Sequence, residues 1–346
     1  MKPFHLGTFS AGGGPAFAGV VIEGQVIAAA ALAPLCARLG YELRQPEQVL
    51  GLLEDWPRNF TALAAAVEAI RNGQATGLPF IAESQLQVLP PVLPRQIFCS
   101  GANYKKHVVD LIVAQGGPHL DGKTSEERRI WGIQRMDERA QQGKPFVFTK
   151  LPSSIIGPFD PITLPPEIQQ ADWELELGVV IGQPARRVPR ATALEYVAGY
   201  VVVNDITARE LVYRPDIPEM GMDWLISKSA PGFLPVGPYL TPAAFIPDPQ
   251  NLTVTLKLNG QVMQHESTAD MIFGVAHLIE YISAYVQLWP GDLICTGSPA
   301  GNGMHYNRFL REGDVLEGSI DGLGTQRNRC QLEALSPAAF GRGVRV

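Results

Sequence analysis

Cysteine is scarce in this 346-residue chain, and its few cysteines lie far apart. No two of them form a Cys-x-x-Cys pair, which excludes zinc-ribbon and thioredoxin-type motifs. Isolated cysteines of this kind are typical of reduced thiols in the core of an intracellular protein. We therefore expect a cytoplasmic protein with four unpaired cysteines: Cys36, Cys99, Cys295 and Cys330.

Long apolar runs are also missing. The longest one, around residues 26–36, is interrupted by Pro34 and is shorter than the roughly 20 apolar residues that span a bilayer. The N-terminal segment MKPFHLGTFSAGGG has no apolar core of a signal peptide. The sequence therefore predicts neither a membrane partner nor secretion.

Basic clusters are absent as well, and the net charge is −6. Proteins that bind nucleic acid usually carry a basic patch, so nucleic acid is not an expected partner. The length suggests about two domains. The 29 prolines and 35 glycines indicate many turns and few long helices.

The order of predicted elements indicates a strand-rich α+β protein. Residues 1–90 are predicted to form a small N-terminal α/β domain, followed by the proline-rich linker LPPVLPRQ. Residues 91–346 are predicted to form the catalytic domain, in which strand-like runs dominate without regular βαβ alternation. These runs are PFVFTK, ELELGVVIG, GYVVVND, LTVTLKLNG, GDLICTG and GDVLEGSI.

A long helix is predicted over residues 124–143. Thr124 and Glu127 fit a capping box, and Gly143 is the predicted stop. An apolar stripe of Ile130, Ile133 and Met136 is expected to pack inward. We consider two roles for the surrounding insertion, about 111–145: a lid over the site, or a fixed surface element or dimer contact.

Two glutamates in ADWELELGVVIG form the first candidate site. Strand side chains alternate between faces, so Glu174 and Glu176 point the same way, roughly 7 Å apart. The next strand-like run ends in Asp205. Three carboxylates on neighbouring strands suit Mg²⁺, Mn²⁺ or Ca²⁺, although a bare Glu-x-Glu is more often a solvent-facing edge.

GANYKKHVVD supplies a second candidate site. On a helix that starts near Tyr104, His107 and Asp110 are three residues apart and share a face. An aspartate that orients a histidine gives a general base able to activate water. Such pairs are also common on helix surfaces.

These segments resemble, in order, the motifs of the fumarylacetoacetate hydrolase family over about residues 96–330. The matching stretches are NYKKH, PFVFTKLPSSIIGPFDPI, DWELELGVVIG, GYVVVNDITARE, SKSAPGFLPVGP, DMIF, PGDLICTGSPAGNG and GDVLEGSIDGLGTQRNR. The resemblance implies a mixed β-sandwich roll with a small N-terminal domain, and a homodimer.

The resemblance also implies roles for individual residues. Glu174, Glu176 and Asp205 would hold a divalent cation, usually Mg²⁺. His107 and Asp110 would activate water, and Lys228 would act in catalysis. The implied substrate contacts are Tyr104, Lys150, Arg209, Thr296 and Gly297.

The chain departs from the family pattern near the substrate. Val212 stands where some members have a glutamine that contacts the substrate, and Pro231 stands where an aspartate is common. Residues 111–145 and the segment YRPDIPEMGMDW are longer than in compact members. These differences bear on which substrate is bound.

The implied activity is metal-dependent hydrolysis of a C–C bond in a small 1,3-diketo acid, an acylpyruvate or fumarylpyruvate-like compound, through a metal-bound enolate. The expected partner is thus a small anionic keto acid. Decarboxylation, hydration or isomerisation of a 2-oxo acid in aromatic or sugar-acid catabolism would use the same site. A metal-stabilised binding protein without activity is the non-enzymatic alternative.

Overall fold

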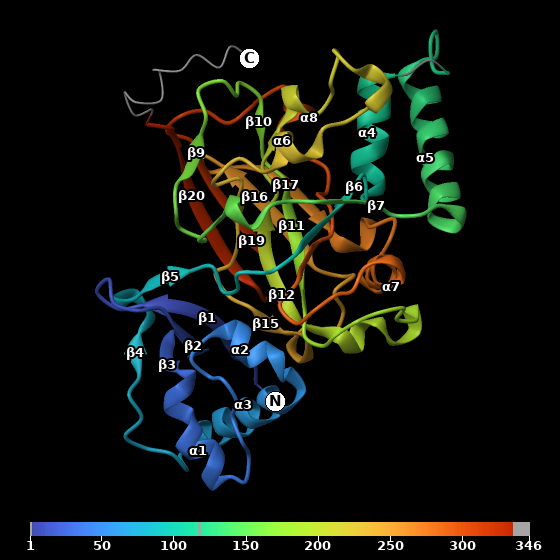
Figure 1. The fold of residues 1–346 in the computed structure, drawn as a ribbon. Helices are drawn as coiled ribbons and strands as arrows, with labels where there is room; N and C mark the ends of the chain where they lie inside the picture. The colour runs from blue at the N-terminus through green and yellow to red at the C-terminus, as the bar shows by residue number, and fades with distance from the viewer. Residues whose placement is uncertain (1, 117–118, 335–346) are drawn as a thin grey trace.

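The computed structural model describes residues 2–116 and 119–334 (Figure 1). The end of the predicted 91–346 domain, residues 335–346, lies outside the described part. Sheets dominate and helices lie around them, which confirms the strand-rich α+β prediction.

The N-terminal unit is a five-stranded antiparallel sheet with three helices. In sheet order its strands are β4 (Ile81–Ala82), β3 (Gln25–Ala28), β2 (Phe17–Ile22), β1 (His5–Ser10) and β5 (Gln87–Leu89). The helices are α1 (Ala33–Arg38), α2 (Val49–Glu54) and α3 (Trp56–Arg71). Leu6 of β1 exchanges backbone hydrogen bonds of 2.9 and 2.8 Å with Leu240, which ties this unit to the rest of the chain.

A six-stranded central sheet carries the site. In sheet order its strands are β15 (Thr241–Pro242), β12 (Val197–Asn204), β11 (Leu175–Ile181), β18 (Leu293–Cys295), β6 (Ile97–Gly101) and β7 (Phe146–Thr149). β18 and β6 run parallel, and the other neighbours are antiparallel. The sheet is therefore mixed, as the family resemblance implies.

A second sheet lies behind the central one (Figure 1). In sheet order its strands are β17 (Gln261–Ser267), β16 (Thr253–Leu258), β19 (Val315–Ile320), β20 (Gly324–Leu332) and β9 (Ile162–Leu164). Gly318 of β19 lies directly against Leu175 of β11, where a Cβ would overlap the leucine side chain. Two short pairs complete the strands: β10 (Ala171–Asp172) with β13 (Thr207–Ala208), and β14 (Leu234–Pro235) with β8 (Ile155–Ile156).

The central strand β11 is buried along its whole length. Leu175 and Leu177 join the core that the two sheets share, as the alternation predicts. Val180, on the opposite face, joins the core of the N-terminal unit. Because both faces of β11 are covered, Glu176 has no route to bulk water along either face and is 2% exposed.

Five helices lie outside the N-terminal unit: α4 (Lys105–Gln115), α5 (Ser125–Gln142), α6 (Trp224–Lys228), α7 (Val275–Tyr285) and α8 (Gly303–Tyr306). The predicted long helix is confirmed as α5, including the Thr124–Glu127 capping box. α4 and α5 stand side by side at the edge of the molecule (Figure 1).

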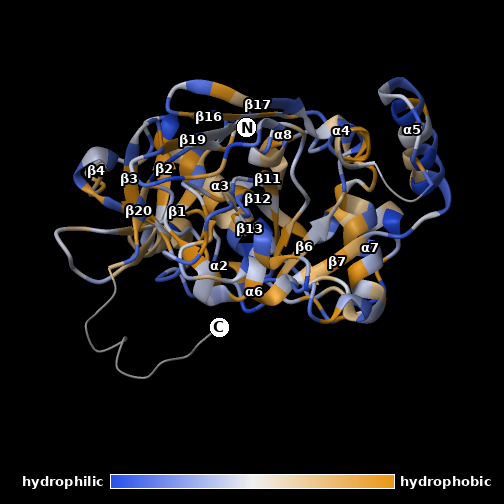
Figure 2. Cartoon of the chain, turned by 90° about the horizontal axis from the view of Figure 1, so that it is seen from above, coloured by the Kyte–Doolittle hydropathy of each residue, from blue (hydrophilic) through white to orange (hydrophobic). Residues whose placement is uncertain are grey.

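The predicted inward stripe of α5 is only partly correct. Met136 is buried, but Ile130 and Ile133 are 49% and 39% exposed. The reason is that α5, a largely hydrophilic helix (Figure 2), packs on α4 along one side and faces outward elsewhere. Among the described helices, none combines the length and apolarity needed to cross a membrane.

Candidate metal centre and active site

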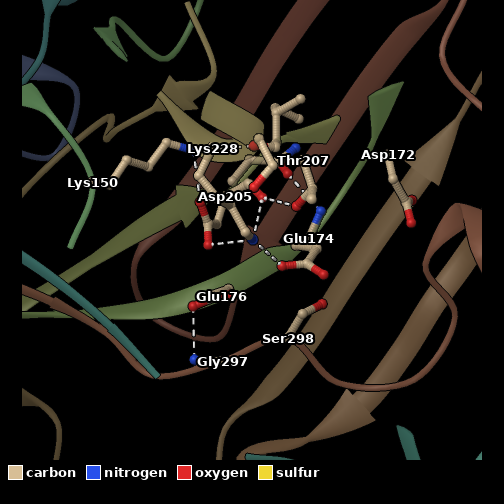
Figure 3. Close-up of polar contacts among 12 residues, drawn as sticks. Lys150, Asp172, Glu174, Glu176, Asp205, Thr207, Lys228, Gly297 and Ser298 are labelled. Atoms are coloured by element: carbon tan, nitrogen blue, oxygen red, sulfur yellow. Dashed lines mark hydrogen bonds and ion pairs between the residues drawn. The ribbon is translucent and has the colours of Figure 1, made fainter. Parts of the chain in front are cut away.

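Three carboxylates meet where β11 begins and β12 ends. Leu175 pairs with Asn204 in the antiparallel ladder, so Glu174, one residue before, lies beside Asp205, one residue after. The Asp205 N–H donates to the Glu174 carbonyl at 2.8 Å. Glu174, Glu176 and Asp205 each offer an oxygen within 4.8 Å of the others, and all three are buried (Figure 3).

Three cations neutralise this cluster. Lys228 Nζ lies between two of the acids, 2.7 Å from Glu174 Oε2 and 2.7 Å from Asp205 Oδ2 (Figure 3). Lys150 Nζ donates to Asp205 Oδ1 at 2.6 Å and to the Phe233 carbonyl at 2.6 Å. Arg209 forms an ion pair with Glu174. Buried carboxylates need such partners because burial strongly disfavours an isolated charge.

The two strand glutamates titrate in opposite directions. Burial acts to raise the pKa of Glu174, but Arg209 and Lys228 outweigh it, and the pKa falls well below the usual range. Burial and the nearby Asp205 charge raise the pKa of Glu176, whose hydrogen-bond donor is the Gly297 backbone N–H at 2.7 Å. Glu176 is thus the member of the cluster that lacks a cation and favours protonation.

The donor set fits a hard divalent cation. Carboxylate oxygens are the ligands that Mg²⁺ and Mn²⁺ prefer, and the cluster has one acid whose charge nothing in the described chain offsets. Glu174, Glu176 and Asp205 would hold the ion, which would supply Lewis-acid chemistry at the floor of the cavity.

Asp172 supports this cluster from behind and was not singled out from the sequence. It is fully buried and accepts from Arg209 Nε at 2.8 Å, from the Gly303 N–H, and from the Met304 N–H at 3.3 Å. Asp172 therefore holds Arg209 against Glu174 and ties it to the start of α8. Its position two residues before Glu174, in the same quoted stretch, is the only sequence signal.

Thr296 and Gly297 brace the ligands and do not line the cavity. The Thr296 Oγ1 donates to the Leu177 carbonyl at 2.9 Å, and Gly297 donates to Glu176. Asn103, also missed from the sequence, holds this turn by donating to the Thr296 carbonyl at 2.8 Å. A Cβ at Gly297, whose φ is +96°, would come within 2.9 Å of the Asn103 Cβ.

His107 faces the cavity from the first turn of α4. Burial lowers the pKa of His107 to about 4, so its imidazole is neutral at physiological pH. Asp110 lies on the same helix, but the described contacts place its carboxylate 3.3 Å from Arg129 Nη1 of α5. No hydrogen bond joins His107 to Asp110 among the described residues.

Tyr104 occupies a position different from the expected substrate contact. It is fully buried, forms the N-terminal boundary of α4, and does not line the cavity. Lys150 also lies behind the cavity, engaged with Asp205. Of the five implied substrate contacts, only Arg209 faces the open space.

The cavity has a volume of about 550 Å³ and two chemically different ends. One end holds the carboxylates with Arg209, Lys228 and His107. The remaining lining is largely apolar and comes from α4, β7, α6 and the segment before α6: Leu111, Phe146, Phe148, Val212, Tyr213, Met222 and Trp224. A small organic acid fits a space of this size.

A buried acidic cluster beside a neutral histidine, on a mixed two-sheet scaffold, defines a divalent-metal enzyme of the keto-acid type. Residues 96–331 match the model of the fumarylacetoacetate (FAA) hydrolase C-terminal domain. The chain is an enzyme of the fumarylacetoacetate hydrolase family.

Named relatives span different reactions. The chain is 34% identical to the mitochondrial oxaloacetate tautomerase Fahd2a of Rattus norvegicus, over 82% of this chain and 80% of that protein. The fumarylacetoacetate hydrolase of Exiguobacterium antarcticum has a TM-score of 0.69 at 28% identity, covering 95% of this chain and 100% of its own. The maleylpyruvate hydrolase of Sphingobium sp. SYK-6, solved with manganese(II) and pyruvate, has a TM-score of 0.68 at 25% identity, covering the same shares.

Glu176→Gln tests the metal site without disturbing the metal-free fold. Glutamine resembles the protonated carboxyl group that burial favours at Glu176, but it cannot supply the charge that a cation needs. In wild-type protein, Mg²⁺ or Mn²⁺ at a hundred times Kd should add about 2.7 kcal/mol to the free energy of unfolding. Thermal melts with and without metal should show this gain in the wild type and its loss in the variant.

The matched control is Glu195→Gln, because Glu195 is an exposed glutamate far from the cluster in the sequence. This control should keep the full stabilisation by metal. A Glu176→Gln protein that metal stabilises as strongly as wild type contradicts the assignment.

Asp172→Asn should weaken metal binding through Arg209. Removing the aspartate charge leaves Arg209 more strongly drawn to Glu174, so the guanidinium competes with the ion. Changes of this kind behind metal ligands typically cost about 10–100-fold in affinity. Calorimetric titration with Mn²⁺ measures the loss, and the exposed Asp121→Asn serves as control. An unchanged Kd for Asp172→Asn would show that Arg209 is held without it.

Proposed function

We propose that the protein hydrolyses a C–C bond in a small 2,4-dioxo acid, releasing pyruvate and a carboxylic acid. The observation that carries this proposal is the neutral, buried His107 that shares one cavity with the three-carboxylate cluster. A general base beside a Lewis-acid site is the combination that water attack on an unactivated carbonyl requires.

The charged end of the cavity binds the keto-acid end of the substrate. The bound cation supplies Lewis-acid polarisation of the keto and enol oxygens. Arg209 and Lys228, both lining the cavity, attract the carboxylate. The other carbonyl then lies toward the apolar lining, where His107 faces it.

His107 takes a proton from water, and the resulting hydroxide adds to the C4 carbonyl. The C3–C4 bond then breaks, its electron pair passes to C3, and protonation at C3 completes pyruvate. The other product carries the added oxygen as a carboxylate. Lys228 offsets the negative charge that develops; burial lowers its pKa, but Asp205 and Glu174 outweigh that effect and keep the amine charged.

Keto–enol tautomerisation of a 2-oxo acid is the second candidate. Two observations favour it: the Asp110 carboxylate contacts Arg129 and not His107, and the similar rat protein is named an oxaloacetate tautomerase. A tautomerase needs proton transfer at carbon and no oriented water. In the hydrolase proposal, Asp110 turns toward His107 when substrate is bound.

Several finer expectations remain predictions. Mg²⁺ is the expected ion, with Mn²⁺ or Ca²⁺ as replacements, and a cytoplasmic homodimer acting in aromatic catabolism is the expected setting. We also keep the lid role of residues 111–145, of which residues 117 and 118 lie outside the described part. Decarboxylation or hydration of a 2-oxo acid, and binding without catalysis, are separated by the product assay below.

His107→Ala should lower kcat/KM for an acylpyruvate by about 10²–10⁴, the usual contribution of a general base. Pyruvate release, coupled to a reductase, reports C–C cleavage, and loss of enol absorbance without pyruvate reports tautomerisation. The exposed His265→Ala on β17 should retain full activity. Full turnover by His107→Ala would overturn the assignment of the base.

The pH profile provides a separate test. A base must be neutral, and because the pKa of His107 is lowered to about 4, the neutral form persists as pH falls through 6.5. With saturating metal, the acid limb of kcat/KM should therefore lie well below pH 6.5. A limb centred near 6.5 would indicate a solvated histidine or a different base.

A further inference from the structure

The end of the cavity away from the carboxylates is built from aromatic side chains. Phe148 of β7 and Trp224 of α6 stack with ring centroids 4.8 Å apart and planes 18° from parallel. Phe146 packs on Trp224 at 5.9 Å and on Phe148 at 6.3 Å. We call Phe146, Phe148 and Trp224 the aromatic wall.

The aromatic wall adjoins the charged cluster directly. Lys228 Nζ lies 5.4 Å from the centre of the Phe148 ring while it also contacts Glu174 and Asp205. Lys228 and Trp224 are the two ends of the same short helix, α6. A substrate anchored at the carboxylate cluster must therefore extend along the wall.

No cation is available for a second carboxylate at that end. Arg209 and Lys228 are the only lysine or arginine residues among the described residues lining the cavity. Both are bound to carboxylates of the cluster. His107, the only histidine in that lining, is neutral because burial lowers its pKa.

The charge of the cluster matches one carboxylate. Four buried acids, Asp172, Glu174, Glu176 and Asp205, face three cations, Lys150, Arg209 and Lys228. A divalent ion leaves a single positive charge in excess, which the carboxylate of a 2-oxo acid neutralises. A second carboxylate would lie unpaired against aromatic rings, at a large desolvation cost.

We infer that the enzyme selects monocarboxylic 2-oxo acids whose distal group is aromatic or bulky and apolar, and that it discriminates against dicarboxylic ones. Val212, Met222 and Leu111 complete an apolar lining around the wall. This selection rests on the proposed function for its reaction, but its recognition step stands on the cavity alone. It sets the chain apart in substrate from the relatives named for oxaloacetate and maleylpyruvate.

Binding of inert 2-oxo acids tests the selection without any turnover. Calorimetric titrations of the Mg²⁺-loaded protein would compare phenylpyruvate, which has a distal ring, with 2-oxoglutarate, which has a distal carboxylate. Stacking on the wall and the missing cation should together make the Kd of phenylpyruvate at least about tenfold lower. Equal affinities, or tighter binding of 2-oxoglutarate, would overturn the inference.

Trp224→Ala removes half of the stacked pair and should narrow the ratio of the two Kd values about tenfold. Leu225→Ala is the matched control, because Leu225 is the next residue of α6, is 50% exposed and does not line the cavity. Leu225→Ala should keep the wild-type ratio. A ratio that Trp224→Ala leaves unchanged would show that the wall does not contact the distal group.

A turnover panel separates failure of this inference from failure of the proposed function. The panel is benzoylpyruvate, acetylpyruvate and fumarylpyruvate, with pyruvate release as the readout. If all three are cleaved and fumarylpyruvate is preferred, the aromatic selection is wrong and the hydrolase proposal stands. If none is cleaved, the hydrolase proposal is wrong, and the two Kd values alone decide the selection.

Discussion

The repulsion among buried carboxylates is the constraint on which the rest of this structure depends. Antiparallel pairing of β11 with β12 forces Glu174 and Asp205 together, and strand alternation adds Glu176. The lysines and Arg209 offset most of this charge, but Glu176 has only a backbone donor. A protein that leaves one acid of such a cluster without a cation is prepared to bind one, because the ion supplies the missing charge.

The scaffold keeps this cluster rigid and dry. β11 contributes one face to the core between the sheets and the other to the core of the N-terminal unit, so its side chains have little freedom. Asp172, Asn103 and Gly297 then hold Arg209, the 296–298 turn and Glu176 through buried hydrogen bonds. Support of this kind fixes the orientation of metal ligands. The reactive region, by contrast, lies where α4, β7 and α6 meet the cavity.

Family membership and reaction are carried by different parts of the molecule. The carboxylate cluster is compatible with relatives named as tautomerase and as hydrolase, because stabilising an enolate-like charge serves both. The base, its orienting partner and the distal wall are where these reactions and substrates diverge. In this chain those parts lie on α4, α5 and the segment leading into α6.

The sequence by itself determined the local features. Period-two alternation predicted that Glu174 and Glu176 share a face while Leu175 and Leu177 enter the core, and the capping box predicted where α5 begins. The run of ordered motifs determined the family. These signals are short-range, so the residues that carry them are neighbours in the chain. Only the tertiary structure decided which distant side chains meet: Asp172 with the Gly303 N–H across 131 positions, Lys228 with Glu174 across 54, Asp110 with Arg129 of the next helix, and Trp224 with Phe148. Such pairs depend on how separate elements pack, which no local pattern encodes.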